Sequence, residues 1–290
     1  MAAVADLHLI AVFVGWFALN IGLSYYNSYV LSHTNFRYAF LLTLINKVVG
    51  FFVAITLMLV RRGLPKPGEV LGQFLRPMVH VQGVMTALNI GLNNWSLVFI
   101  SLTMNQVLRS TVPLPTAALS MLLEGKYFSW HLWASMLLLI SGCVLAAWGA
   151  MGNEPILGIL VALGSVFATA MWTVTSAILM QTGAKPLDSV SLLFVAGPTC
   201  MVTLGIFFCV QDLPRLANFQ PDPEHPVPPV HMMVLYLGVA AAMASAYDIV
   251  HNEFVKITSS LNMAIMGNSK VHRRAMPPMV PRAAPLRYRD

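Results

Sequence analysis

The stretch from residue 93 to residue 124, NNWSLVFISLTMNQVLRSTVPLPTAALSMLLE, is apolar and long enough to cross a bilayer, although Arg109 lies inside it. A charged side chain at the bilayer centre costs at least about 2.5–3.5 kcal/mol, so it persists where it faces a polar cavity or has a partner. Ser101 and Asn105 precede Arg109 at intervals of four residues, which predicts one shared helix face. Two prolines that follow predict a bend. This pattern favours a helix that lines an aqueous path holding an anion; the alternatives are an arginine that reaches the interface and a structural ion pair.

The composition indicates a membrane protein, because 57% of the residues are hydrophobic and only 10% are charged, with a mean hydropathy of +0.71. Soluble domains carry about 25% charged residues. The apolar runs are roughly 20 residues long, which favours helices over the shorter alternating strands of a barrel. Eight runs are predicted as spans: residues 7–31, 36–60, 77–97, 98–123, 130–150, 156–180, 190–210 and 232–255. Residues 61–76 and 211–231 are rich in proline and are predicted to be loops.

The basic residues carry information about topology. Five of the 17 lie within residues 273–290, so the net charge of +6 is not evidence for a nucleic-acid partner. With the N-terminus in the cytosol, seven basic residues fall in cytosolic loops and two on the opposite side, as the positive-inside rule requires. The three cysteines lie in apolar runs, where we expect them to be packing residues with neither disulfide nor metal spacing.

A second apolar segment with polar residues, SSLNMAIMGNSK at residues 259–270, ends in a lysine that lies 161 residues after Arg109. This spacing predicts two inverted five-helix halves with a site between them: residues 1–150, and residues 151–270 as an incomplete second half. Residues 271–290 contain five arginines and four prolines and cannot span lipid. We therefore expect eight full spans and a cut ninth in a ten-span design. We expect this tail to come from a frameshift, a retained intron or a mistaken gene model; the alternative is a genuine basic tail that binds anionic headgroups.

Two stretches resemble the triose-phosphate/nucleotide-sugar translocator family, within the drug/metabolite transporter superfamily. They are NNWSLVFISLTMNQVLRSTVPLP at residues 93–115 and YDIVHNEFVKITSSLNMAIMGNSK at residues 247–270. The resemblance covers residues 7 to about 270 and implies ten helical spans in two inverted halves, with a central site that opens alternately to each side. It also implies exchange of an anionic phosphate compound for phosphate or a nucleoside monophosphate, without a cofactor.

The resemblance implies which residues form the site. Arg109 and Lys270 match the cations that bind phosphate oxygens in the family, with arginine in place of the commoner lysine, and Tyr247 matches a tyrosine that contacts substrate. We expect hydrogen bonds from three further residues to complete the pocket: Lys47, Asn105 and Asn268. For Lys47, the alternative is pairing with a carboxylate or a backbone carbonyl. Val271 stands where sugar-phosphate members usually carry arginine, which favours the nucleotide-sugar branch.

The sequence therefore predicts an antiporter in a Golgi or ER membrane, which exchanges a nucleotide sugar for a nucleoside monophosphate by alternating access. The alternatives are a sugar-phosphate/phosphate antiporter and a truncated, non-transporting paralogue that acts as a binding partner or regulator. We expect neither an enzyme nor a metal site, because HExxH and GxSxG motifs are absent and the histidines of the spans lack metal spacing. The expected partners are a small anionic phosphate compound and the lipid bilayer, with no nucleic acid. The oligomeric state stays open between a monomer and a homodimer.

Overall fold

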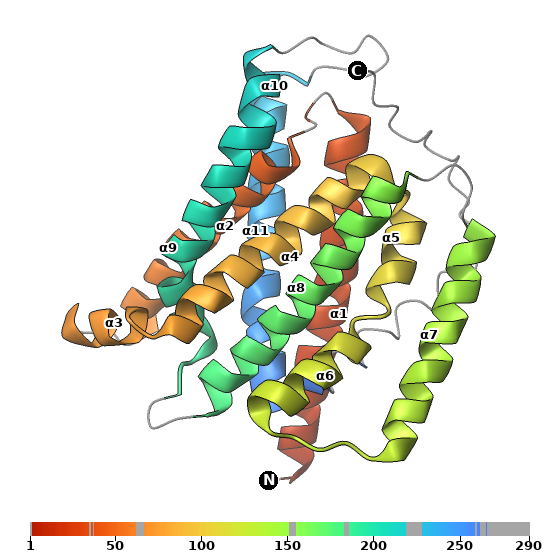
Figure 1. The fold of residues 1–290 in the computed structure, drawn as a ribbon. Helices are drawn as coiled ribbons and strands as arrows, with labels where there is room; N and C mark the ends of the chain where they lie inside the picture. Colours follow the sequence, from red (N-terminus) through yellow and green to blue (C-terminus); the bar gives the residue numbers. More distant parts are fainter. Residues whose placement is uncertain are drawn as a thin grey trace.

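Every element of the described chain is helical (Figure 1). The structure, a computed structural model, describes residues 2–34, 36, 38–61, 67–150, 155–182, 186–218, 228–258, 260–261 and 265. The elements are α1 (Ala2–His33), α2 (Ala39–Arg61), α3 (Pro67–Phe74), α4 (Pro77–Phe99), α5 (Leu102–Arg109), α6 (Pro113–Glu124), α7 (Trp130–Ala150), α8 (Ile156–Gln181), α9 (Ser189–Phe207), the π-helix η1 (Phe208–Asp212), α10 (Leu213–Ala217) and α11 (Val230–Ile257).

The described residues contain five helical segments that are long and apolar enough to cross a membrane, so the protein is an all-α, multi-pass membrane protein. These segments are His8–Leu31, Ala39–Arg61, Ile156–Gln181, Ser189–Ala217 and Val230–Ile257. Large apolar side chains such as Leu138 and Trp148 are exposed, whereas Thr43, Lys47 and Asn89 are buried. This distribution suits a molecule whose surroundings are lipid and whose interior holds a polar site.

The bundle is built around α4, which packs most extensively on α8 and also on α9 (Figure 1). A β-carbon added at Gly83 of α4 would lie 2.7 Å from Thr199 Cβ and 2.8 Å from the Ala196 carbonyl oxygen of α9. Glycine is therefore required for this close approach of the two helices. α2 packs on α9, and α11 packs on both α1 and α2, while α7 lies at the edge of the bundle beside α5 (Figure 1).

The stretch predicted as one bent span at residues 98–123 forms two helices, α5 and α6, joined by a short turn. Pro113 occupies the start of α6 and has no N–H to donate to the carbonyl of Arg109. That carbonyl instead accepts a hydrogen bond from Val112 N at 3.2 Å, which closes a tighter turn. Ser101 lies just before α5 and caps it, because its side chain accepts a backbone N–H at 3.3 Å. Of the three polar residues predicted to share one helix face, Ser101 is therefore the N-cap of α5, whereas Asn105 and Arg109 lie within the helix.

Two predicted loops contain helical turns. The loop predicted before α4 includes α3, which begins at Pro67, and the loop predicted at residues 211–231 begins with the end of η1 and α10. The other predicted spans are helical, but they are shorter or more polar than the five segments above, so the eight-span count and the inverted repeat stay predictions. Residues 266–290, which include Asn268, Lys270 and the predicted tail, lie outside the described residues.

Candidate functional site

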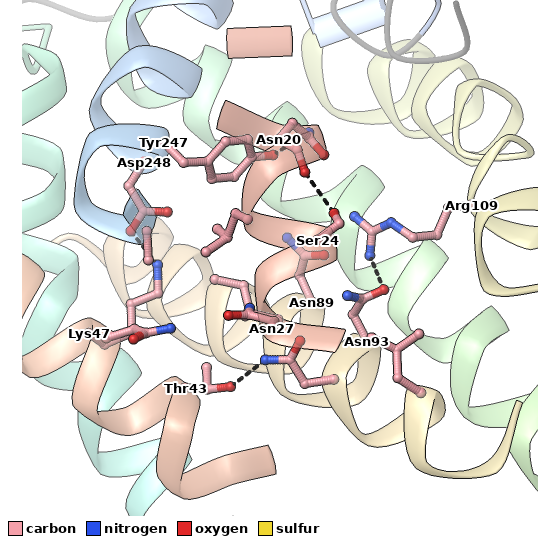
Figure 2. Close-up of a pocket in the computed structure, with 16 residues that line it drawn as sticks. Asn20, Ser24, Asn27, Thr43, Lys47, Asn89, Asn93, Arg109, Tyr247 and Asp248 are labelled. Carbon is pink, nitrogen blue, oxygen red and sulfur yellow. Dashed lines mark hydrogen bonds and ion pairs between the residues drawn. The ribbon is translucent and has the colours of Figure 1, made fainter. Parts of the chain in front are cut away.

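A polar cavity of about 70 Å³ lies among α1, α2, α4, α5 and α11 (Figure 2). The polar residues that line it are Asn20, Ser24, Asn27, Thr43, Asn46, Lys47, Asn89, Asn93, Asn94, Arg109, Tyr247 and Asp248. Six of them are asparagines, and each amide group offers both donors and an acceptor. Such a lining suits a ligand that is itself rich in hydrogen-bonding groups.

Arg109 forms one wall of this cavity and is the last residue of α5. Its Nη1 donates to Asn93 Oδ1 of α4 at 2.8 Å (Figure 2). No ion pair joins Arg109 to a carboxylate among the residues that the structure describes. A guanidinium has five N–H donors in a planar fork that matches phosphate and carboxylate oxygens. Arg109 therefore keeps both its positive charge and most of its donors for a ligand.

Lys47 and Asp248 form a buried ion pair on the opposite side of the cavity (Figure 2). The Lys47 Nζ atom donates to Asp248 Oδ2 at 2.5 Å, and the two side chains are 5% and 6% exposed. Lys47 comes from α2 and Asp248 from α11, so the pair joins two helices that are far apart in the sequence. Together with Arg109, the described residues that line the cavity include two cations and one carboxylate, so their net charge is one positive charge.

Tyr247 closes the cavity between α1 and α11. Its hydroxyl oxygen accepts a hydrogen bond from Asn20 Nδ2 at 3.0 Å. One turn along α1, Ser24 Oγ donates to the backbone oxygen of Asn20 at 2.7 Å (Figure 2). The bond from Asn20 holds the phenol ring at the cavity wall, beside Asp248 and across from the arginine.

A second, smaller cavity of about 30 Å³ also has the ion pair in its lining. It shares Lys47 and Asp248 with the first cavity, and its remaining polar lining comes from Gln82, Thr86, Cys200 and Asn252, with Trp172 as an aromatic wall. The buried ion pair therefore forms part of the wall between the two cavities.

The structure brings together three of the residues predicted for the site, since Lys47, Arg109 and Tyr247 all line the larger cavity. Asn105 is fully buried outside this lining, where its Nδ2 donates to Ser96 Oγ of α4 at 2.7 Å. The predicted Asn268 and Lys270 lie outside the described residues.

Asp248 and Asn93 line the site but were not predicted to belong to it. The sequence did contain a signal for each: a carboxylate within an apolar span, and an asparagine four residues after Asn89 on one helix face. The partner of Asp248 is Lys47, which lies 201 residues away in the sequence, and no local pattern connects the two.

Comparison with known proteins finds relatives that are named as translocators or transporters. A protein of Arabidopsis thaliana named "Probable sugar phosphate/phosphate translocator" is 25% identical over 269 residues, which cover 90% of this chain and 70% of the relative. The UDP-uronic acid transporter 1 of the same plant is 24% identical, covering 89% of this chain and 81% of the relative. The UDP-galactose transporter 1 of that plant is also 24% identical, covering 88% of this chain and 74% of the relative.

The family model described as the Triose-phosphate Transporter family matches residues 7–270 of this chain. The match includes every described helix that lines the polar cavity. The members of this family are transporters rather than enzymes, and the relatives handle sugar phosphates or nucleotide sugars by name. The chain that builds this cation-bearing cavity is therefore a transporter that belongs to the triose-phosphate transporter family.

Proposed function

We propose that this protein is an antiporter of an organic phosphate, and that it exchanges a nucleotide sugar for a nucleoside monophosphate by alternating access. The observation that carries the proposal is the lining of the larger cavity. Among the described residues, this lining contains two cations, one carboxylate and six asparagine amides. An anionic ligand with many polar groups complements both features.

The charge of the wall favours a phosphate compound over a neutral one. Arg109 has no described carboxylate partner, and removing a charge from water without a partner is costly. A phosphate offsets that cost and accepts two parallel N–H bonds from the guanidinium. In this proposal Arg109 holds a phosphate from α5, and Lys270 holds it from the second half of the chain.

The uncharged lining supports a substrate with a sugar and a base. Asn20, Asn27 and Asn89 stand between the arginine and the ion pair (Figure 2). Their amides match hydroxyl groups and ring nitrogens, because each can donate and accept. The names of two relatives, a UDP-uronic acid transporter and a UDP-galactose transporter, agree with such a substrate. Val271 after Lys270 supports the same branch by resemblance.

The size of the cavity supports alternating access. Sites for small molecules occupy about 300–1,000 Å³, whereas the described cavity holds about 70 Å³. A nucleotide sugar therefore enters only if the helices around the cavity separate. Two inverted five-helix halves that rock about a central site would supply this movement.

A sugar-phosphate/phosphate antiporter is the second candidate. One relative carries that activity in its name at 25% identity, close to the 24% of the nucleotide-sugar transporters. A small phosphate compound also needs less opening of the cavity. Uptake of each substrate class against the matching internal substrate separates the candidates.

The test is exchange by the purified full-length protein in liposomes. The vesicles are loaded with UMP, GMP or inorganic phosphate, and uptake of labelled UDP-galactose, a UDP-uronic acid and a triose phosphate is measured. We expect uptake of a nucleotide sugar only into vesicles loaded with a nucleoside monophosphate, and loss of that uptake in Arg109→Ala. Arg61→Ala is the matched control, because Arg61 is exposed at the end of α2.

Uptake that does not depend on the internal nucleotide contradicts antiport. Uptake of triose phosphate against internal phosphate, with no uptake of nucleotide sugars, favours the second candidate. Exchange that is unchanged in Arg109→Ala contradicts the assigned site.

Location and orientation are part of the proposal. We propose a Golgi or ER membrane and an N-terminus in the cytosol. The orientation is supported by the seven basic residues in cytosolic loops against two on the opposite side. Epitope tags at residue 1 and within the loop predicted at residues 211–231 should differ in their accessibility to antibody when only the plasma membrane is permeabilised. An accessible loop with an inaccessible N-terminus contradicts this orientation.

A further inference from the structure

The ion pair between Lys47 and Asp248 occupies an unusual place, because both residues line the larger cavity and also the smaller one. The two side chains are almost fully buried, at 5% and 6% exposure. A pair that only joined α2 to α11 could lie in the dry packing between them. Here it stands between two spaces, and each space offers other polar groups.

On the side of the larger cavity, Lys47 faces the same space as Arg109 (Figure 2). These two cations come from α2 and α5 and lie on opposite walls. In this structure the carboxylate of Asp248 neutralises Lys47, which leaves Arg109 as the cation without a described carboxylate. An incoming phosphate would meet both cations and would compete with Asp248 for one of them.

On the side of the smaller cavity, the carboxylate has an alternative environment. Gln82, Thr86 and Asn252 line that space together with Asp248. Asn252 lies one turn further along α11, is 4% exposed, and its amide oxygen has no hydrogen-bond partner among the described residues. The side-chain donors of Gln82 and Thr86 already bond to other groups of the protein. The Asn252 amide is not held through its oxygen, so it can turn its N–H donors toward a carboxylate that rotates away from Lys47.

We propose that Asp248 is a built-in competitor for the substrate phosphate: it neutralises Lys47 while the larger cavity is empty, and it turns to the smaller cavity when a phosphate binds Lys47. This inference rests on the proposed transport function and adds the role of one carboxylate to it. It also accounts for release of the phosphate, because the return of Asp248 to Lys47 replaces the phosphate as the partner of that cation.

The competitor role and a purely structural role predict different effects of Asp248→Asn on the affinity for phosphate compounds. If Asp248 competes with phosphate, then Asp248→Asn leaves Lys47 available and tightens the binding of phosphate compounds. If the pair only holds α2 against α11, the same change exposes an unpaired buried cation, weakens the fold and does not improve binding.

The experiment measures the dissociation constants of UMP and inorganic phosphate for the purified full-length protein, by isothermal titration and by ligand-induced shift of the unfolding temperature. We expect Asp248→Asn to bind the probe about tenfold more tightly than wild type, which corresponds to about 1.4 kcal/mol. The double variant Lys47→Met/Asp248→Asn should lose this gain and bind more weakly than wild type. In liposomes, Asp248→Asn should exchange more slowly, because release of the bound phosphate is no longer assisted.

Glu253→Gln is the matched control, since Glu253 is a carboxylate on the same helix that pairs with Lys256 at 3.8 Å and lines neither cavity. It should bind the probes as wild type does. If Asp248→Asn does not fold, the double variant decides, because an apolar or amide replacement of a buried pair is often tolerated. A double variant with wild-type affinity overturns the inference.

Failure of the competitor role can be distinguished from failure of the proposed transport function. Wild-type protein that binds the probes, together with an Asp248→Asn variant that binds them no better, overturns the competitor role and leaves the proposed function standing. Wild-type protein that binds neither the probes nor UDP-galactose overturns the proposed function, and the competitor role falls with it.

Discussion

Asn93 Oδ1 lies 2.8 Å from Arg109 Nη1, and this bond crosses the break between α4 and α5. The two residues are sixteen positions apart, and the helix is interrupted between them at Ile100 and Ser101, where the backbone is extended. An arginine at the end of a short helix has many rotamers, and holding a long side chain in one of them costs entropy. The amide of Asn93 offsets part of that cost and points the guanidinium along the cavity wall.

Asn93→Leu should therefore weaken substrate binding without removing any charge from the site. A hydrogen bond to a charged group contributes about 1.5–3 kcal/mol, so the half-saturation concentration for exchange should rise roughly tenfold or more. The measurement is the concentration dependence of exchange in liposomes. Thr56→Ala is a suitable control, because its exposed hydroxyl bonds only to the Phe52 carbonyl of its own helix. An unchanged half-saturation concentration in Asn93→Leu would show that this bond does not position Arg109.

Arg109→Lys should keep a measurable part of the exchange activity, in contrast to Arg109→Ala. A lysine preserves the positive charge but replaces a planar fork with a compact ammonium group on a flexible chain. We expect a rise in the half-saturation concentration with a smaller change in the maximal rate. Parallel exchange assays on the two variants make the comparison. Equal activity of Arg109→Lys and Arg109→Ala would mean that the fork geometry, and not the charge alone, is essential.

Gly83→Ala should destabilise the contact between α4 and α9. The new β-carbon would lie 2.7 Å from Thr199 Cβ, so one helix has to shift. Overpacking of this kind costs about 1–3 kcal/mol and should lower the unfolding temperature in detergent. Gly205→Ala is the matched control on α9, where a β-carbon meets nothing within 4 Å. Because alanine favours helix over glycine, the control should be neutral or stabilising. Equal unfolding temperatures in the two variants would contradict the packing argument.

Asp212→Ala should loosen the start of α2. Asp212 is 2% exposed, and its Oδ2 accepts a hydrogen bond from Leu41 N at 2.8 Å, so a residue of η1 caps a helix 171 positions earlier. Loss of a helix cap costs about 0.5–2 kcal/mol, and the carboxylate also interacts with the positive end of the helix dipole. The unfolding temperature should fall more for Asp212→Ala than for Asp212→Asn, which retains an acceptor. No loss in the alanine variant would exclude a capping role.

The sequence predicts the helical class and most helix positions because hydropathy is a local property. The span predicted at residues 130–150 coincides with α7, and the spans predicted at 156–180 and 232–255 end within two residues of α8 and α11. The break after Arg109 is deeper than the predicted bend, since a proline at the start of α6 leaves the arginine carbonyl to a tighter turn. Proline content alone does not distinguish a bend from two separate helices.

The candidate site was also predicted only in part from the sequence. The sequence by itself determined that Lys47 and Arg109 are cations inside apolar runs, and the cost of a charge in lipid made each a candidate for a polar cavity. Only the tertiary structure decided their partners. Lys47 meets Asp248 from a helix 201 residues away, and Asn105 turns to Ser96 instead of the cavity. The cost of a charge in an apolar run depends on that residue and its neighbours along the chain, whereas the choice of partner depends on which helices pack side by side.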